Sequence, residues 1–543
     1  MNLFTETNTR NSADKPHPEG QDKGVLILDG IPRDLPLSLL IRSRDGETRF
    51  ILARPHFAEW TSQTAVSTIL PTIVSSLHGR DFVWVSSAYS LASTCLIPAS
   101  GGLAEVLGRR PVMLSAIGLF ALGSALCGSA QNMTWLIAGR AIQGAGGGAI
   151  YSLSSIIIGD FVPLRERGTY QSTTGMVWTI AASIGPMVGG SLATKGQWRW
   201  LFYLNLPISG VAAGLVLIFL TLRTPTGTLR EKLSRMDWVG NAIITGSSAS
   251  CMIALTWGGI QFPWTSAHVL IPLVIGCVGI TFFMVYEYIS AKDPIEHGHP
   301  SPALTHAPLD FLPAYFQACF AASPIRSGVL ALSLCASIGP SVVIAGASIG
   351  LTKKYRPQLW IGWVLIILGM GALSTLRADS PLSHYGVLPL IMSIGAGIVY
   401  ASTYFPVLAP LPITENAHAL AFFAYLRSFA AVWGITIGTA VLQNELGKRL
   451  PADILQELPG GIAAVYSVIP LINSLPDDLK SPLRVAFAGS AAVIWEVMAG
   501  IAGIGFLASL FMEALPLHTQ VDEKWGLQSG SAESIPVVPN ANL

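Results

Sequence analysis

The sequence predicts an all-α membrane protein, and three observations lead to that fold class. Of the 543 residues, 51% are hydrophobic and only 12% are charged, whereas about a quarter of the residues in a soluble protein are charged. The apolar residues gather into runs of about 20, the length that a helix needs to cross a bilayer. Polar residues collect in short segments between these runs. Because this small number of charged residues cannot cover a water-facing surface, we expect lipid to surround most of this chain.

Twelve apolar runs are long enough to span a bilayer. They lie near 82–104, 112–130, 135–158, 169–192, 200–222, 238–259, 268–289, 328–350, 359–376, 386–411, 417–442 and 484–512. Two further runs, 64–77 and 311–322, are short for a span. If both also cross, most lysines and arginines of the short loops lie on the same side as the N-terminal tail, as the positive-inside rule requires. We therefore predict fourteen spans with both termini in the cytoplasm.

This numbering divides the chain into two halves. The expected parts are a polar cytoplasmic tail at 1–60, a six-helix half at 61–222, an inner loop with two extra helices at 223–308, a second six-helix half at 309–512 that includes an extracellular loop at 443–483, and a cytoplasmic tail at 513–543. The N-terminal tail lacks an apolar signal segment near its start, so we expect the first helix to direct insertion.

Composition and missing motifs exclude several classes of function. The net charge is +1 and no basic block is present, so no nucleic-acid partner is expected. The six cysteines all fall in apolar runs without a CxxC pair, so we expect neither a metal site nor a redox site. The sequence contains no HExxH, GxSxG or Walker P-loop, so it predicts neither an enzyme nor an ATP-driven pump. No cofactor is expected.

The first motif, GGLAEVLGRRPVML, lies in the short loop between 82–104 and 112–130. It combines Gly101 and Gly108 with Glu105, Arg109 and Arg110. Glycines let helix ends approach closely, and a carboxylate with nearby arginines can fasten neighbouring helices in one state of a cycle. The pattern resembles the loop motif of the major facilitator superfamily, GxLaDrxGrkxxl, with glutamate in place of the aspartate. The resemblance implies a gate at this loop.

The second motif, WLIAGRAIQGAGGGAI, places Arg140, Gln143 and Gly144 inside an apolar run. A buried arginine in a membrane helix is costly unless it faces a cavity or a partner. The pattern resembles RxxqGxgaa of the same superfamily, in which the arginine is linked to proton coupling. In the alternative interpretation, Arg140 extends to the outer interface close to Trp135.

The third motif, SIGPMVGGSLA, contains Gly185, Pro186, Gly189 and Gly190. Proline removes a backbone donor and bends a helix, and small residues let neighbouring helices pack closely. The pattern resembles the antiporter motif gxxxGPxxGG of exporters, except that Ala181 replaces the leading glycine. In the alternative interpretation it is a packing kink of the kind found in any helix bundle.

Together the motifs resemble the drug:proton antiporter branch with fourteen spans, to which fungal multidrug and toxin efflux pumps belong. The resemblance implies two six-helix halves with two extra central helices. It also implies a small-molecule substrate, protons and the lipid bilayer as partners, a monomer, and a location in the plasma membrane. One departure is that this chain has Ser62 where the branch has an aspartate in its first helix. Segment 290–312 also departs from the pattern of the branch. We hypothesise that missing or misread exon ends in the gene model explain the departures at 50–62 and 290–312.

Transport against a gradient needs a titratable group that responds to substrate. The candidates within or beside the spans are Glu59, Asp160, Glu287, Asp310, Glu496, Arg140 and Arg427. We expect Asp160 to form an inner gate with Arg167 or with the Arg109/Arg110 loop, and Arg427 to line a central cavity. For each acid taken singly, snorkelling or a contact at the membrane interface is the favoured interpretation. The aromatic residues Tyr170, Trp178 and Tyr425 suit a cavity for cationic or aromatic molecules, or simple packing.

The leading hypothesis is a proton-coupled exporter of small organic compounds, such as drugs, toxins or secondary metabolites, that works by alternating access. The first alternative is an uptake carrier for a metabolite or siderophore. The second is a non-transporting or degenerate member of the family, which the serine at position 62 motivates.

Overall fold

The structure is a computed structural model. It describes residues 56–516, apart from 67, 71, 75, 78–82, 162–163, 221–227, 229, 232–233, 235, 260, 291–306, 321, 411–415 and 451–476. Contacts divide the chain into a unit Met1–Glu47, which lies outside the described residues, and a unit Thr48–Leu543. Within the described part the regular elements are helices, and the extended pairing is one isolated bridge between Gly258 and Phe262. The predicted tails therefore fall almost wholly outside the described residues.

The first half of the bundle begins with a helix whose described residues lie within 56–77. The helices that follow are α2 (Val83–Leu107), α3 (Arg109–Gly128), α4 (Met133–Phe161), α5 (Leu164–Thr194), α6 (Arg199–Tyr203) and α7 (Asn205–Phe219). The run predicted as one span at 200–222 is one candidate span, Arg199–Ile218, which a turn at Leu204 divides into α6 and α7.

Two further helices, α9 (Trp238–Trp257) and α10 (Ala267–Ser290), separate the halves in sequence. The second half consists of α11 (Ala307–Phe320), α12 (Pro324–Thr352), α13 (Arg356–Ser374), α14 (Leu382–Ser402), α15 (Tyr404–Leu408), α16 (Asn416–Arg449) and α19 (Asp477–Leu510). Twelve helices of the described part are long and apolar enough to cross a membrane, which confirms the twelve long runs.

The two short runs are also helical, and both begin earlier than their apolar residues do. The first helix already includes His56, the first described residue, rather than beginning near 64, because the bundle provides partners for His56 and Glu59, which are buried. Helix α11 starts at Ala307 and packs against α12, α16 and α19. A prediction from hydropathy alone makes such helices too short, because it treats every charged side chain as unfavourable in the membrane, even where the fold provides a partner for it.

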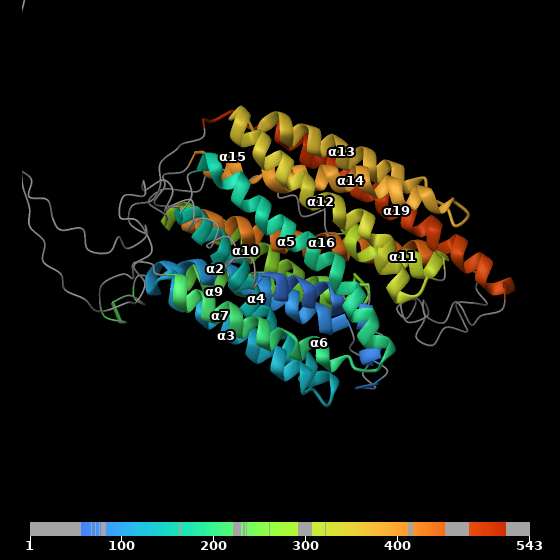
Figure 1. Cartoon of the computed structure of the whole chain (residues 1–543), viewed down its shortest axis with the longest axis horizontal. Helices are drawn as coiled ribbons and strands as arrows, with labels where there is room; N and C mark the ends of the chain where they lie inside the picture. The colour runs from blue at the N-terminus through green and yellow to red at the C-terminus, as the bar shows by residue number, and fades with distance from the viewer. Residues whose placement is uncertain are drawn as a thin grey trace, which may run out of the picture. The chain divides into compact units, whose positions relative to one another are not determined.

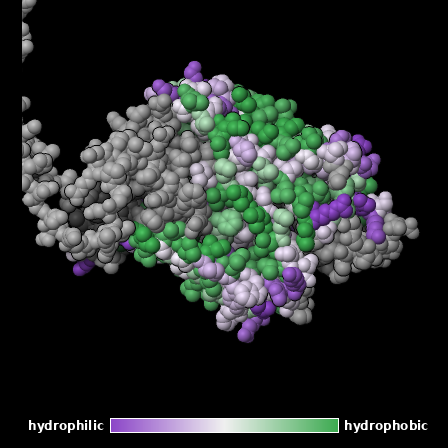
Figure 2. Space-filling model, in the orientation of Figure 1, coloured by the Kyte–Doolittle hydropathy of each residue, from purple (hydrophilic) through white to green (hydrophobic). Residues whose placement is uncertain are grey.

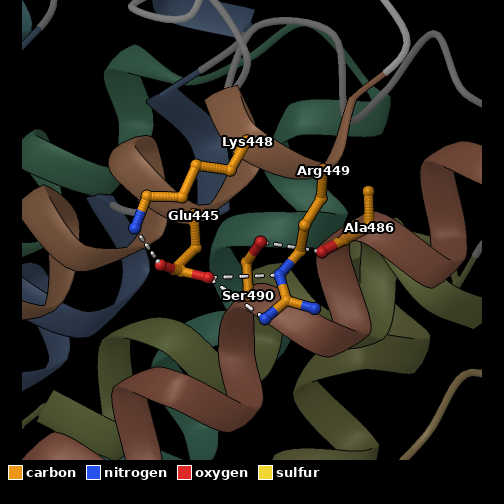
Figure 3. Close-up of polar contacts among 5 residues, drawn as sticks. All are labelled: Glu445, Lys448, Arg449, Ala486 and Ser490. Carbon is orange, nitrogen blue, oxygen red and sulfur yellow. Dashed lines mark hydrogen bonds and ion pairs between the residues drawn. The ribbon is translucent and has the colours of Figure 1, made fainter.

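Helices α16 and α19 extend into the stretch expected to be an extracellular loop. Figure 3 shows how Glu445 supports the last turn of α16, with Lys448 Nζ at 2.8 Å and Arg449 Nη2 at 3.1 Å from its carboxylate. Pairs at this spacing stabilise a helix, and cations suit its C-terminal end. The Arg449 guanidinium lies against Gly489 of α19. The middle of the predicted loop, 451–476, lies outside the described residues.

The helices of each half pack mainly on one another. Figure 1 shows α2, α3, α4 and α7 together in blue and green, and α12, α13, α14 and α19 together in yellow to red. Contacts between the halves run through α5 with α12, and through α16 with α2 and α4. These pairs form the interface across which one half can move against the other.

The extra helix α9 touches both halves. Thr245 Oγ1 donates to the Cys95 carbonyl of α2 at 3.0 Å, and Ser248 Oγ lies 2.8 Å from the Tyr425 hydroxyl of α16. Helix α10 packs chiefly on α9. Its outer face exposes Ile271, Val274, Ile275, Val278 and Phe282. Figure 2 shows hydrophobic side chains across the middle of the visible face and hydrophilic ones toward its margins. Such a surface suits lipid rather than water.

Small residues set the register between α5 and α12. At each contact the glycine of one helix faces a side chain of the other, so that the backbones approach closely. The contacts join Gly175 to Val342, Thr179 to Gly339, Pro186 to Gly328, and Gly190 to Ile325. Residue numbers rise along α5 as they fall along α12, so the two helices are antiparallel along most of their length.

Glycines of α4 allow equally close packing against α2 and α3. A Cβ added at Gly144 or Gly148 would collide with the backbone of α2 at Tyr89 or Ser93. A Cβ at Gly146 would collide with the backbone of α3 at Phe120. The glycine-rich segment of the second motif therefore holds three helices together.

We predict that Gly148→Ala lowers the thermal unfolding temperature of the purified protein in detergent. The new methyl group meets the Ser93 carbonyl, and overpacking of this kind costs about 1–3 kcal/mol. The matched control is Gly210→Ala, because a Cβ at Gly210 on α7 meets nothing within 4 Å. Equal unfolding temperatures for the two variants would contradict the packing described here.

Candidate functional site

Among the described residues, the bundle buries six side chains of the Asp, Glu, Lys, Arg and His types. They are His56, Glu59, Arg109, Arg140, Asp160 and Arg427. A buried charge in an apolar bundle costs several kcal/mol unless hydrogen bonds and an opposite charge compensate it. The hydrogen-bond and ion-pair partners of each buried group therefore indicate its role in the protein.

Arg109 and Asp160 form a buried ion pair at one end of the bundle. Arg109 is the first residue of α3, and its Nε donates to Asp160 Oδ2 at 2.9 Å, near the end of α4. Its Nη1 donates to the Ala104 carbonyl of α2 at 3.0 Å. Between these helices, Gly108 has φ 99°, a left-handed conformation that favours glycine. One guanidinium thus ties the ends of three helices.

The rest of the loop motif lies around this ion pair. Arg110 is partly exposed and donates to the Leu217 carbonyl near the end of α7. Gly101 is buried, and Glu105 is partly buried on the last turns of α2. Of the two partners expected for Asp160, the structure brings it to Arg109. The side chain of Arg167 lies outside the described residues.

Arg140 lies two turns into α4, and its side chain is 1% exposed. Its Nε donates to the Val85 carbonyl of α2 at 3.0 Å, and its Nη1 donates to Gln143 Oε1 at 2.6 Å. The guanidinium stacks on the Tyr89 ring, 4.3 Å from its centroid. The side chain therefore points into the bundle rather than outward to the membrane interface.

Gln143 extends this network to two further helices. Its Nε2 donates to Ser124 Oγ of α3 at 2.8 Å and to Ser62 Oγ of the first helix at 3.3 Å. Gly144 brings α4 onto the α2 backbone one residue later. At the position where the branch has an aspartate, this chain thus supplies a neutral hydroxyl to the arginine network.

A carboxyl group nevertheless lies close by, one turn earlier on the first helix. Glu59 is 4% exposed, its Oε2 is 3.3 Å from His56 Nδ1, and the Tyr89 hydroxyl donates to its Oε1 at 3.4 Å. The ring of that tyrosine carries the Arg140 guanidinium on its face. A Cβ at Gly147 would collide with the Tyr89 hydroxyl, so this glycine makes room for the array.

The sequence analysis included Glu59 among seven candidates without identifying its partners. The signal was the spacing of His56, Glu59 and Ser62, which places all three on one helix face. We call the four side chains His56, Glu59, Tyr89 and Arg140 the proton array. His56 Nε2 is buried without a hydrogen-bond partner, and the imidazole stacks on Trp60 at 4.6 Å.

Arg427 lies on α16 of the second half and is 6% exposed. Its guanidinium carbon is 3.6 Å from the centroid of the Tyr400 ring and 5.5 Å from that of Phe423. Its Nη2 donates to the Tyr400 carbonyl at 3.4 Å. Among the described side chains no acidic group pairs with it.

The other candidates fall elsewhere. Glu496 is on the exposed face of α19, and the side chains of Glu287, Asp310 and Tyr170 lie outside the described residues. Tyr425 bonds to α9 as described above. Trp178 packs with Tyr400 on a cluster of α12 and α14 residues.

The third motif packs α5 against helices of both halves. Gly185 and Gly189 lie against Thr64 and Ala65 of the first helix. Pro186 and Gly190 face α12, as shown by the register of that pair. The small residues of the third motif therefore lie at two contacts of α5, one with the first helix in the same half and one with α12 in the second half.

Comparison with known proteins fits this geometry. The family model of the Major Facilitator Superfamily matches residues 56–435. The chain belongs to the Major Facilitator Superfamily. Membership makes it a membrane transporter rather than an enzyme.

Fungal relatives and solved structures of the superfamily support the same assignment. The efflux pump FUS6 of Gibberella moniliformis is 36% identical over 94% of this chain and 97% of its own length. The MFS-type efflux pump LUC4 of a Fusarium species is 34% identical over 96% of this chain and 97% of its own length. The structure of the human organic anion transporter MFSD10 has a TM-score of 0.55 at 14% identity, over 86% of this chain and 99% of that one. The structure of the proton:xylose symporter XylE has a TM-score of 0.55 at 12% identity, over 88% of this chain and 98% of that one. At these identities the two structures show the fold alone, and they confirm the predicted major facilitator architecture.

We predict that Asp160→Asn destabilises the protein strongly, because it leaves the Arg109 charge buried without its partner. Breaking one side of a buried pair costs about 3–5 kcal/mol. The measurement is thermal unfolding in detergent, with Arg110→Gln as a control that removes a partly exposed arginine of the same loop.

A double variant, Arg109→Met with Asp160→Leu, removes both charges and is expected to recover most of the lost stability. Should Asp160→Asn unfold at the wild-type temperature, the ion pair would have no structural role.

Proposed function

We propose that this protein is a proton-coupled efflux transporter for small organic compounds that works by alternating access. The observation that carries the proposal is the proton array, in which a buried carboxyl accepts from the hydroxyl of one tyrosine and a buried guanidinium lies over the ring of the same tyrosine. Purely structural packing is achieved more cheaply with apolar residues. A transporter driven by protons needs such a titratable group inside its bundle.

Within the array, Glu59 is the proton acceptor and Arg140 responds to its charge. While the carboxyl is ionised, it and Tyr89 compensate the guanidinium through the ring and its hydroxyl. Protonation of Glu59 removes that compensation. The free energy of burying the Arg140 charge then rises, and the conformation in which Arg140 bonds to Val85 and Gln143 becomes less stable. This changes the relative stability of the conformations that differ in those contacts.

The position of Glu59 also weakens the alternative of a degenerate, non-transporting member. Ser62 motivated that alternative, because it removes the aspartate of the branch. A buried carboxyl one turn away, linked to the same arginine, supplies the missing titratable group.

The interface between the halves supports alternating access. At the bundle end that holds Arg109 and Asp160, Ile156 of α4 packs with residues of the second half, among them Ile349, Phe405 and Leu420. This hydrophobic cluster closes that end in the present conformation. By the positive-inside rule the end is cytoplasmic, so opening toward the cytoplasm requires this cluster between the halves to separate, while the Arg109–Asp160 ion pair stays within the first half.

Export rather than uptake is supported by two observations. Relatives with identities of 34–36% are named efflux pumps, and the small residues of the third motif lie at the α5–α12 interface. For the cellular setting we propose a monomer in the plasma membrane with both termini in the cytoplasm, toward which the loop arginines point.

We predict that Glu59→Gln abolishes uphill transport driven by a pH gradient in proteoliposomes. It should leave counterflow exchange of the same compound, because exchange needs substrate movement without a net proton. The measured compound is the first member of a fluorescent panel that the wild-type protein accumulates. In the wild type it should move opposite to the protons.

The matched control is Glu496→Gln, which removes an exposed carboxyl from another membrane helix and should retain both activities. Full uphill transport by Glu59→Gln would rule out the proton array as the coupling site. Movement of substrate with the protons would favour an uptake carrier instead.

A further inference from the structure

The buried charges of the described bundle do not balance. Three guanidinium groups and two carboxyl groups are buried. Arg109 is paired with Asp160, and Arg140 is linked to Glu59 through Tyr89, whose ring contacts the guanidinium and whose hydroxyl donates to the carboxyl group. Arg427 remains without an acidic partner among the described side chains. A proton on His56 would add a further positive charge rather than offset this one.

Arg427 also has unused hydrogen-bonding capacity. A guanidinium has five N–H groups, and one of them donates to the Tyr400 carbonyl at a long 3.4 Å. Tyr400 stacks on its face, which leaves N–H groups at the edge for an acceptor. Arg427 is 6% exposed, and its remaining N–H groups are not among the fully enclosed, unpartnered atoms of the described residues. A carboxylate fits such an edge with two parallel hydrogen bonds.

Stacking on aromatic rings recovers part of the cost of burying this charge, but it supplies no counter-charge. The two other buried arginines show what full compensation looks like in this bundle. Arg109 has a carboxylate and a backbone carbonyl, and Arg140 has a carbonyl, an amide oxygen and a ring that binds a carboxylate. Arg427 is incomplete by comparison, as expected of a group that binds a transported anion.

The surroundings of Arg427 are aromatic and come from both halves. Tyr400 and Trp178 of α5 pack against the same cluster of α12 and α14 residues, and Tyr151 of α4 lies close to Tyr400. Tyr151 in turn meets the His56 ring edge-on at 6.2 Å. The Phe423 ring is also near the guanidinium, with its centroid 5.5 Å from the guanidinium carbon. Arg427 is therefore located where the halves meet, beside rings that suit a flat apolar body.

We propose that the transported compounds are organic anions, and that Arg427 binds their acidic group while the surrounding rings hold a planar, apolar body. This rests on the proposed function, since it assigns the substrate class of the same transporter. It also revises the cationic substrates considered in the sequence analysis, because an uncompensated guanidinium repels a cation.

The test uses three pyrene compounds with one shared body and different charge: 1-pyrenebutyrate, 1-pyrenebutanol and a pyrenebutyl trimethylammonium salt. Binding to the full chain in lipid nanodiscs is measured by energy transfer from tryptophan, without a pH gradient. The wild type should bind pyrenebutyrate about tenfold or more tighter than pyrenebutanol, and the ammonium salt most weakly.

Arg427→Gln should lose this preference for the anion and bind pyrenebutanol within about twofold of wild type. Arg427→Lys keeps the charge and should retain part of the preference. Arg377→Gln, a change at an exposed arginine between α13 and α14, is the matched control and should bind as wild type does. If Arg427→Gln does not fold, the proposal is tested by the ratio of the wild-type affinities for pyrenebutyrate and pyrenebutanol and by the same ratio in Arg427→Lys.

Failure of pyrenebutyrate to bind, binding no tighter than that of the alcohol, or an unchanged preference in a folded Arg427→Gln would overturn the proposal. The outcome is independent of proton coupling. Loss of the anion preference alongside intact proton-driven export leaves the proposed function standing, and anion binding without proton-driven export leaves this proposal standing.

Discussion

The structure depends on one constraint, which is how an apolar bundle compensates buried arginine side chains. It does so in three ways. Arg109 has a carboxylate partner, and Arg140 has a carbonyl, an amide oxygen and a tyrosine ring. Arg427 is supported mainly by aromatic rings. Since unpaired charge is expensive in such surroundings, we propose that these differences correspond to a structural role for Arg109, a coupling role for Arg140 and a ligand-binding role for Arg427.

Glycine packing makes this compensation possible. The Val85 carbonyl reaches Arg140 because α2 lies directly on α4, and that approach depends on Gly144 and Gly148. The Tyr89 hydroxyl reaches Glu59 beside Gly147. The small residues and the arginine of the second motif therefore act as one unit, in which close backbones supply the oxygen atoms that the charge requires.

The sequence predicted the fold well, because apolar runs of span length and three motifs each report a constraint local in the chain. It predicted less of the site, which depends on contacts between distant helices. The pairing of Glu59 with Tyr89 joins residues thirty positions apart. The first helix includes His56 because of those partners, which hydropathy does not count. In the same way, the sequence placed Asp160 near an arginine without deciding between Arg109 and Arg167, since only the fold brings the start of α3 to the end of α4.

The central claim is that the Arg140 charge couples proton movement to substrate movement. The most direct measurement records proton flux with a pH-sensitive dye enclosed in proteoliposomes, on addition of substrate, for wild type, Arg140→Lys and Arg140→Gln. The account predicts that wild type moves protons when substrate is present, that lysine retains part of this flux, and that glutamine abolishes it in a correctly inserted protein. Substrate-dependent proton flux at the wild-type rate in Arg140→Gln would contradict the account.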